Sequence, residues 1–430
     1  MFRKELNISN KDFDSDLSDF LYKKESTDKE VVSSVSEILK DVSSRGDDAL
    51  IKLTKKLDNH SVESFFVSED EINDSFGRIN KEVIAALEFS FKNILQFHDK
   101  CWDSLNLQSI DSEVSRIFKP IRSALLYAPG GKAAYPSSVL MAAGPAIASQ
   151  VKDLYLTTPF IDGEVNDLTI AAAKVAGIKK IAKLGGAQAI AAFSFGTESI
   201  PKVDKIVGPG NSYVAEAKRQ LFGTVGIDSI AGPSEIVVLA NESSSPEQVA
   251  WDLLAQAEHD EDASSILICT SNEVIEKVKK VIQSELPKLD RAEIILSSLK
   301  NNGLILKIKF LKESINIINR IAPEHLHLAF DSNEIETNNL TAGIILEGSN
   351  SAVTLSDYVL GPSHILPTKA SSRFSSPLSV EDFIISSTKV SIKTEVDNNY
   401  YNELLDKASI LARAEGLTAH AISVEKRKKD

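Results

Sequence analysis

Cysteine, basic charge and long apolar runs are all scarce in this sequence, and each shortage argues against a class of protein. Only two cysteines are present, Cys101 and Cys269, too few for a disulfide framework. Acidic residues outnumber basic ones by 61 to 48, and the net charge of −13 argues against a nucleic-acid partner. No apolar run approaches the length of a membrane span, and the first residues lack the apolar core of a signal peptide. We therefore expect a cytoplasmic protein with no membrane or nucleic-acid partner.

The rest of the composition, with 43% hydrophobic and 25% charged residues, is that of an ordinary globular protein. The first hundred residues predict helices, among them one over Asp47–Leu57 and a long periodic pattern over Glu69–His98. From about Ile117, strand-like and helix-like segments alternate, which is typical of βαβ units on a parallel sheet. A second run of this kind begins at Ala231, with no long linker before it.

We therefore predict an α/β fold of two intimately packed lobes with Rossmann-like parallel sheets. The expected domains are an N-terminal helical segment packing on the second lobe (1–110), a first α/β lobe (111–232), a second α/β lobe (233–378) and a small C-terminal module (379–430).

Residues 245–262 carry much of the polar chemistry and predict a helix. Ser245 suits the N-cap position, and Gln248 completes a capping box. Helical spacing places Gln256 close to the inward face, with His259 three residues further on. Burying these groups without partners would be costly, and a pair at this spacing can reach one metal ion. Ordinary hydrogen bonds at a helix edge are the alternative, which this stretch alone favours.

Two distant residues, Asp357 and His420, would complete a ligand set. Together with Gln256 and His259 they offer nitrogen and oxygen donors for Zn²⁺ or a similar divalent metal. Because glutamine is a weak donor, Mn²⁺ or Co²⁺ could substitute. Four separately hydrogen-bonded residues remain the alternative, since the spacing is long-range.

A carboxylate and an imidazole are adjacent at Glu324 and His325, directly after Pro323. In a regular strand the two side chains would point to opposite faces. The proline makes a turn or a helix start the expectation, and there both can face one site. Such a pair supplies two proton-transfer groups that can be tuned near neutral pH. A surface pair without function is the alternative.

Three polar residues lie at the carboxyl ends of predicted strands of the first lobe, where parallel sheets bind ligands: Tyr127, Gln188 and Asn211. Small residues at these junctions allow close backbone approach, and helix N-termini favour anionic phosphates. No GxGxxG motif follows any of these strands, so ordinary turn chemistry also accounts for the pattern.

Taken together, the motifs resemble those of the histidinol dehydrogenase family, from about Glu30 to Val424. The matching stretches are YAPGGKAAYPSSVLM, GGAQAIAAF, VGPGN, YVAEAKRQLFG, IAGPSE, DLLAQAEHD, APEHL, SDYVLGPSHILPT, RFSSPLSV and LTAH. Several are long and contain rare residues in order, so the resemblance is far more specific than a lone glycine motif.

The resemblance implies an NAD-dependent enzyme of histidine biosynthesis that oxidises L-histidinol through L-histidinal to L-histidine and consumes two NAD⁺ in turn. It implies that Glu324 and His325 are the catalytic pair. It implies one zinc ion per site, held by Gln256, His259, Asp357 and His420. Substrate contacts would come from these four ligands and from Ser234, His325, His364 and Glu415. The positions that match NAD contacts are Tyr127, Gln188 and Asn211.

The family also implies a homodimer with intertwined subunits, in which the C-terminal module crosses over. His420 and Glu415 would then complete the partner's site. One departure is the sequence KASS at residues 369–372, where the family usually has a glycine-rich turn, and His327 receives no role. Two other functions remain open: a metal-dependent hydrolase, since zinc with Glu and His also activates water, and a non-catalytic binder of histidinol-like amines.

Overall fold

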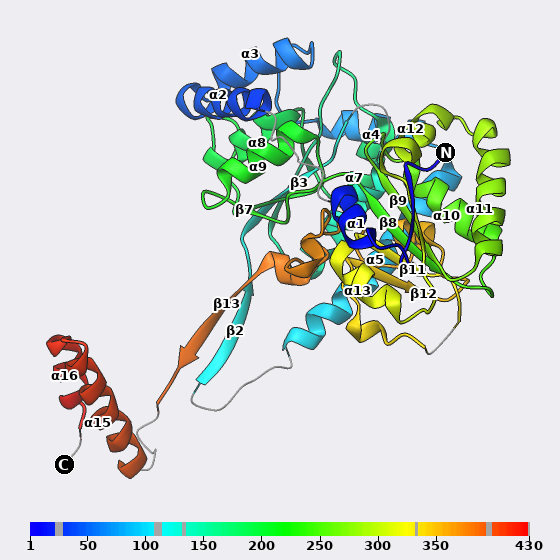
Figure 1. The fold of residues 1–430 in the computed structure, drawn as a ribbon. Helices are drawn as coiled ribbons and strands as arrows, with labels where there is room; N and C mark the ends of the chain where they lie inside the picture. Colours follow the sequence, from blue (N-terminus) through cyan, green and yellow to red (C-terminus); the bar gives the residue numbers. More distant parts are fainter. Residues whose placement is uncertain (22–28, 107–113, 131–134, 332–333, 393–397, 429–430) are drawn as a thin grey trace. The chain divides into compact units, whose positions relative to one another are not determined.

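The computed structural model describes residues 1–21, 29–106, 114–130, 135–331, 334–392 and 398–428 (Figure 1). The chain divides into two compact units. The first combines Met1–Asp103 with Pro120–Ile384, and the second combines Ser104–Lys119 with Ile385–Asp430. Both predicted lobes belong to the first unit, apart from the start of the first lobe up to Lys119, and the predicted α/β class with parallel sheets is confirmed. None of the helices in the described part of the chain is long and apolar enough to cross a membrane.

A five-stranded parallel sheet forms the first lobe, in the order β5-β4-β3-β6-β7. Its strands are β3 (Ser123–Tyr127), β4 (Asp153–Thr157), β5 (Lys180–Ala182), β6 (Lys205–Val207) and β7 (Gly226–Ile227). The connecting helices are α6 (Pro136–Ala148), α7 (Asp167–Val175), α8 (Gly186–Phe195) and α9 (Ser212–Leu221). Leu125 and Leu126 of β3 enter different apolar cores, because both faces of the sheet are covered. The strand order reverses between β3 and β6, the switch point where such sheets bind ligands.

A six-stranded parallel sheet forms the second lobe, in the order β1-β10-β9-β8-β11-β12. Its strands are β1 (Lys4–Asn7), β8 (Glu235–Ala240), β9 (Ser264–Cys269), β10 (Leu304–Lys307), β11 (His325–Leu328) and β12 (Ile344–Glu347). The helices of this lobe are α10 (Pro246–Ala257), α11 (Asn272–Glu285), α12 (Ala292–Asn302), α13 (Glu313–Ile321) and α14 (Val353–Tyr358). Leu326 and Leu328 of β11 enter the core beneath α13. His325 and His327 alternate with them and therefore face the other side, which α10 covers.

The N-terminal segment is shared between the two lobes, which corrects the expectation that it packs on the second lobe. β1 pairs with β10, and α1 (Phe13–Leu21) joins the same core. However, α2 (Lys29–Arg45) packs against α8 and α9 of the first lobe, and α3 (Asp47–Leu57) packs against α8 (Figure 1).

The long helical pattern predicted over Glu69–His98 is two helices, α4 (Glu69–Arg78) and α5 (Lys81–Asn106). The side chain of Asn80 accepts the N–H of Glu82, and such an asparagine favours the start of a new helix.

The second unit is discontinuous in sequence. It pairs β2 (Val114–Pro120) with β13 (Ile384–Val390) in a two-stranded sheet, followed by the packed helices α15 (Asn398–Ala414) and α16 (Thr418–Glu425). The expected module began at residue 379 and included no earlier segment. The unit takes in Ser104–Lys119 because β13 needs a partner strand, and β2 provides it.

Candidate active site

The predicted catalytic pair lies at the amino edge of the six-stranded sheet. After α13, Ala322 adopts the left-handed conformation (φ 46°), and a bend at Glu324 leads directly into β11. The sequence predicted a turn or a helix start here, and the structure has a bend followed at once by a strand. Because Glu324 lies in the bend, its carboxylate and the ring of His325 meet in one site, with Oε2 3.5 Å from Nδ1.

Neighbouring elements hold both side chains of this pair. The N–H of Glu235 on β8 donates to Glu324 Oε2 over 2.8 Å, and its carbonyl oxygen lies 3.3 Å from His325 Nδ1. On the other side of the ring, Nε2 lies 3.2 Å from Asp357 Oδ1 on α14. Both residues of the predicted catalytic pair are buried. The two ring nitrogens therefore face acceptors, which favours the doubly protonated imidazolium.

The electrostatics of this cluster follow from its buried charges. Burial disfavours the charged form of His325, but Glu324 and Asp357 outweigh it and raise the pKa of His325 to about 10. Burial likewise raises the pKa of Asp357, whereas the hydrogen bond and charge of His325, with the charges of His364 and His259, hold that pKa below its usual value. Three imidazoles therefore lie close to one carboxylate.

The helix α10 ends earlier than the sequence pattern predicts. Ser245 caps it by accepting the N–H of Gln248 over 3.4 Å. The helix stops at Ala257, so His259 lies in a bend beyond its end and is exposed, instead of sharing the helical face with Gln256. The predicted spacing of three residues on one helix is therefore wrong for this pair.

Gln256 is the buried polar side chain that α10 presents to the site. It is 1% exposed, and within the described part of the chain neither its amide oxygen nor its amide nitrogen has a hydrogen-bond partner. α10 packs against α14, the helix of Asp357. A buried amide without partners is costly, so this side chain fits a site completed by a ligand.

His364 links the two lobes at the site. Its Nδ1 lies 2.8 Å from the carbonyl oxygen of Asp357, and its Nε2 lies 3.1 Å from Ser138 Oγ. Ser138 is in the first turn of α6, which follows β3 at the carboxyl edge of the five-stranded sheet. That edge therefore meets the amino edge that carries Glu324 and His325. Sequence reasoning assigned Ser138 no role, although its motif YPSSVLM contains the serine pair that could have indicated one.

The other predicted substrate and ligand residues are divided between the two units. Ser234 directly precedes β8 at the same amino edge. His420 on α16 and Glu415 between α15 and α16 are exposed residues of the second unit, so the first unit holds three of the four predicted ligands. Among the residues that the structure describes, no group of three or more His, Cys, Asp or Glu side chains could hold a metal ion by itself. The predicted zinc ligands include a glutamine and a residue of the second unit. They therefore do not depend on three His, Cys, Asp or Glu side chains lying together in the first unit.

The predicted NAD-contacting residues lie at the carboxyl edge of the five-stranded sheet. The buried hydroxyl of Tyr127 accepts the N–H of Gly186 over 3.0 Å, and burial raises the pKa of Tyr127 to about 12. Gln188 is 1% exposed, and its buried Oε1 has no partner among the described residues. Asn211 is exposed and caps α9. Gln188 thus offers an unsatisfied acceptor next to the switch point.

A buried ion pair fixes the loop between β6 and α9. Lys218 Nζ binds Asp228 and donates to the carbonyl oxygen of Gly208 over 3.1 Å, while Asp228 Oδ2 accepts the N–H of Gly208 over 2.7 Å. Gly208 has a φ of 114°, and a Cβ there would lie 2.3 Å from Tyr127 O. Only glycine allows this close approach at the switch point. Sequence reasoning missed Lys218 and Asp228, because the pair connects an α9 side chain to the end of β7.

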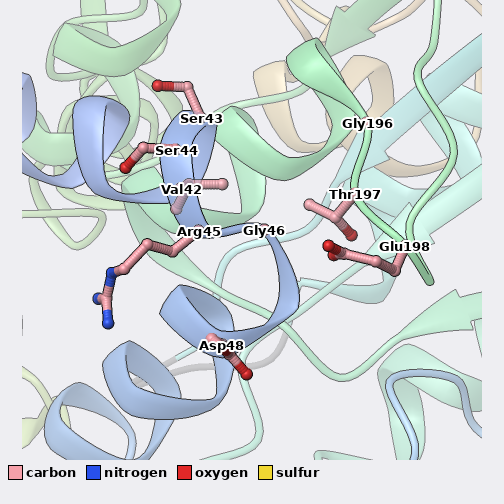
Figure 2. A pocket seen from close by; sticks show the side chains of 9 residues that line it. All are labelled: Val42, Ser43, Ser44, Arg45, Gly46, Asp48, Gly196, Thr197 and Glu198. Atoms are coloured by element: carbon pink, nitrogen blue, oxygen red, sulfur yellow. The ribbon is translucent and has the colours of Figure 1, made fainter.

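A separate hollow lies where α2, α3 and the end of α8 meet (Figure 2). The carboxylate of Glu198 points toward the turn at Gly46 and accepts the N–H of Asp47 over 2.9 Å. The carboxylate of Asp47 in turn accepts the hydroxyls of Thr197 and Ser199. The start of α3 is thus already satisfied by the chain itself, and the residues lining this hollow include none of the predicted site residues.

Comparison with known proteins gives one consistent family. A sequence profile described as histidinol dehydrogenase matches residues 21–428. Histidinol dehydrogenase of Nitrosomonas europaea is 42% identical over 423 residues, which are 96% of each chain. That of Clostridium acetobutylicum is 43% identical over 407 residues, 93% of this chain and 92% of the relative. The crystal structure of histidinol dehydrogenase from Elizabethkingia anophelis matches with a TM-score of 0.90 at 32% identity, covering 99% of this chain and 98% of that one.

Proposed function

The chain belongs to the histidinol dehydrogenase family, and on that premise we propose that it oxidises L-histidinol through L-histidinal to L-histidine, with NAD⁺ as electron acceptor and zinc as the bound metal. The enzyme is an oxidoreductase, and the proposed reaction removes four electrons, two for each NAD⁺. The observation that supports it most directly is the buried Glu324–His325 pair, held between Glu235 and Asp357 where the two sheet edges meet.

The residues present fit a zinc ion. Gln256 has a buried amide without a partner among the described residues. Asp357 is close enough to His259 for the charge of that histidine to lower the pKa of the carboxyl group. We infer that these three, with His420, hold the metal. Zinc held there would help to orient a substrate that carries an imidazole and an amine, since both are good nitrogen donors to this metal.

The carboxyl edge of the five-stranded sheet fits the dinucleotide. Gln188 Oε1 is a buried acceptor that no described residue satisfies. It lies close to Gly186, whose N–H donates to the hydroxyl of Tyr127, the last residue of a strand at the switch point. Ser138 on this edge contacts His364 of the second lobe. A dinucleotide bound at this edge would therefore reach toward His325.

His325 takes the proton in the first oxidation. If Asp357 held the zinc ion, it would no longer accept from His325 Nε2, while the carbonyl oxygen of Glu235 would keep the proton on Nδ1. Nε2 is then the free base. It accepts the hydroxyl proton of the alcohol while hydride leaves the carbinol carbon for NAD⁺. The products are the aldehyde and one NADH.

Glu324 activates water in the second oxidation. Neither cysteine is among the described side chains of the site, so the aldehyde is oxidised as its hydrate and not as a thioester. Glu324 takes a proton from water as the oxygen adds to the aldehyde carbon, while His325 returns its proton to the carbonyl oxygen, which completes the hydrate and frees Nε2. The hydrate then loses hydride to a second NAD⁺ and a hydroxyl proton to His325 Nε2, which gives the carboxylic acid. A buried site also limits escape of the aldehyde.

We further propose a cytoplasmic homodimer in which the second unit completes the partner's site. Ile410 and Leu411 on α15 are 61% and 64% exposed, and Ile422 on α16 is 44% exposed. Exposed apolar side chains on so small a unit indicate a protein partner. A second copy of the chain, contacting His420 and Glu415, provides one.

Metal removal tests this proposal. Protein treated with a chelator is expected to lose histidinol-dependent NADH formation, and added Zn²⁺ or Mn²⁺ should restore it.

Gln256→Ala should lower the bound zinc per chain, measured by metal analysis, whereas Gln248→Ala, in the exposed first turn of the same helix, should not. Full activity in metal-free protein would contradict the zinc assignment. Turnover that needs zinc but not NAD⁺ would favour the hydrolase instead.

A further inference from the structure

Glu235, the first residue of β8, lies directly beside the proposed catalytic pair. β8 and β11 are parallel neighbours with Ile236 opposite His325, so Glu235 is opposite Glu324. Its N–H donates to Glu324 Oε2 over 2.8 Å, and its carbonyl oxygen lies 3.3 Å from His325 Nδ1. One residue thus orients both side chains through its backbone.

The carboxyl group of Glu235 has no role in the proposed mechanism. Its Oε1 accepts the N–H of Lys369 over 3.2 Å, and its Oε2 is buried without a hydrogen-bond partner among the residues described. Thr368 Oγ1 of the same loop accepts the N–H of Gly232 over 2.7 Å, which anchors the loop next to β8. The loop therefore orients this carboxyl group.

The charged groups that face Glu235 come from two elements. Glu324 approaches from the bend before β11 and Lys369 from the loop, while His325 reaches only the backbone carbonyl and Asp357 faces His325 from the far side. Burial and the neighbouring Glu324 raise the pKa of Glu235 to about 7. The N–H and the charge of Lys369 act in the opposite direction and lower it. The carboxyl group of Glu235 therefore changes its charge near neutral pH, next to Glu324.

We propose that Glu235 is a positioning residue for Glu324 and His325. Its carboxyl group lies next to Glu324, and its negative charge makes Glu324 a stronger base. The inference rests on the proposed function, in which Glu324 takes a proton from water. A neighbouring like charge disfavours ionised Glu324 and so favours proton uptake.

Glu235→Gln tests the proposal, because glutamine keeps the shape and the acceptor for the Lys369 N–H but removes the charge. Difference infrared spectroscopy of the zinc-loaded wild-type protein should show a buried carboxylic acid that ionises near neutral pH, and the variant should lack this signal. With histidinal and NAD⁺, the variant's kcat should fall about tenfold, and the acid limb of its pH profile should move about one unit lower. The KM for NAD⁺ should not change.

Glu247→Gln, an exposed carboxylate on α10, is the matched control and should change none of these readouts. A Glu235→Gln protein with the wild-type infrared titration and pH profile would overturn the proposal. If this variant does not fold, Glu235→Asp replaces it: this variant should keep the titrating acid and lose kcat, and unchanged kcat would overturn the proposal. If wild-type protein forms no NADH from histidinol or histidinal, the proposed function is wrong, and the infrared titration still decides whether Glu235 and Glu324 are coupled.

Discussion

His325 and His327 lie two residues apart on β11 and face the same side of the sheet, but they meet different partners. Sequence reasoning assigned His327 no role. In the structure its Nδ1 lies 2.7 Å from Asp252 Oδ2, and its Nε2 lies 3.0 Å from the carbonyl oxygen of Gly348. Both neighbours are acceptors, so the ring carries both protons and forms a buried ion pair. Asp252 is one turn before Gln256 on α10, so this pair fixes the helix that carries a proposed ligand.

The stability of this pair should depend on pH. Burial opposes the charge of His327, but the hydrogen bonds that its ring donates to Asp252 and to the carbonyl oxygen of Gly348 raise its pKa above the usual 6.5. The stabilisation is therefore complete below about pH 6.5 and is lost as the pH rises through the raised pKa. Asp252→Asn is expected to lower the free energy of unfolding by about 2 kcal/mol at pH 6 and by clearly less at high pH. Urea unfolding at both pH values measures this, with exposed Asp260→Asn as control. An equal loss at both pH values would show that His327 is neutral.

At the scale of elements, the loop of residues 368–373 explains a departure from the family pattern. Lys369 (φ 53°) and Ala370 (φ 58°) both adopt the left-handed conformation, which favours glycine. At these positions the resemblance to the family predicts a glycine-rich turn. The conformation is maintained by the bond from the Lys369 N–H to Glu235 and by the bond from Ser372 Oγ to the carbonyl oxygen of Pro323.

Ala370→Gly is therefore expected to stabilise the protein by about 1 kcal/mol, because it relieves a conformation that is unfavourable for side chains other than glycine. Thermal unfolding of variant and wild type measures the change. The matched control is Ala86→Gly on the exposed face of α5, where the same substitution should cost about 1 kcal/mol. A loss of stability in Ala370→Gly would mean that the loop is not strained at this position.

The elements with strong local patterns could be predicted from the sequence, and those that depend on distant pairing could not. The helix predicted over Asp47–Leu57 has these bounds in the structure, because its apolar spacing and charged ends are local signals. The strand Lys4–Asn7 was missed, since Leu6 is its one buried residue and it forms by pairing with β10. The bend at Glu324 likewise depends on distant segments, because the next residue begins β11, which pairs with β8 and β12.

The same division applies to the candidate site. Glu324 and His325 are adjacent in sequence, so their pairing was predictable. Glu235 belongs to the motif IAGPSE but received no role, because only the register of β8 against β11 brings it beside Glu324. Ser138 is similar, since 226 residues separate it from His364. Long-range contacts of this kind leave no periodic signal in one sequence.

For the whole molecule, the proposed dimer makes a test of shared sites possible. A His259→Asn chain and a His420→Asn chain should each be inactive alone, because each loses a proposed zinc ligand. Unfolding and refolding the two chains together should restore about a quarter of the wild-type activity, since half of the dimers would be mixed and each would contain one intact site. A mixture that stays inactive, with heterodimers demonstrated by mass spectrometry, would show that His420 does not act in the partner's site.

The central claim is that one buried site performs two successive oxidations, and the yield of NADH tests it most directly. With zinc bound, limiting L-histidinol and excess NAD⁺, the wild-type protein is expected to form about two NADH per histidinol. Glu324→Gln should form the first NADH rapidly and the second much more slowly, because only the second step needs activated water. A wild-type yield of about one NADH would contradict the four-electron reaction, and no NADH from zinc-loaded protein would contradict the proposed function itself.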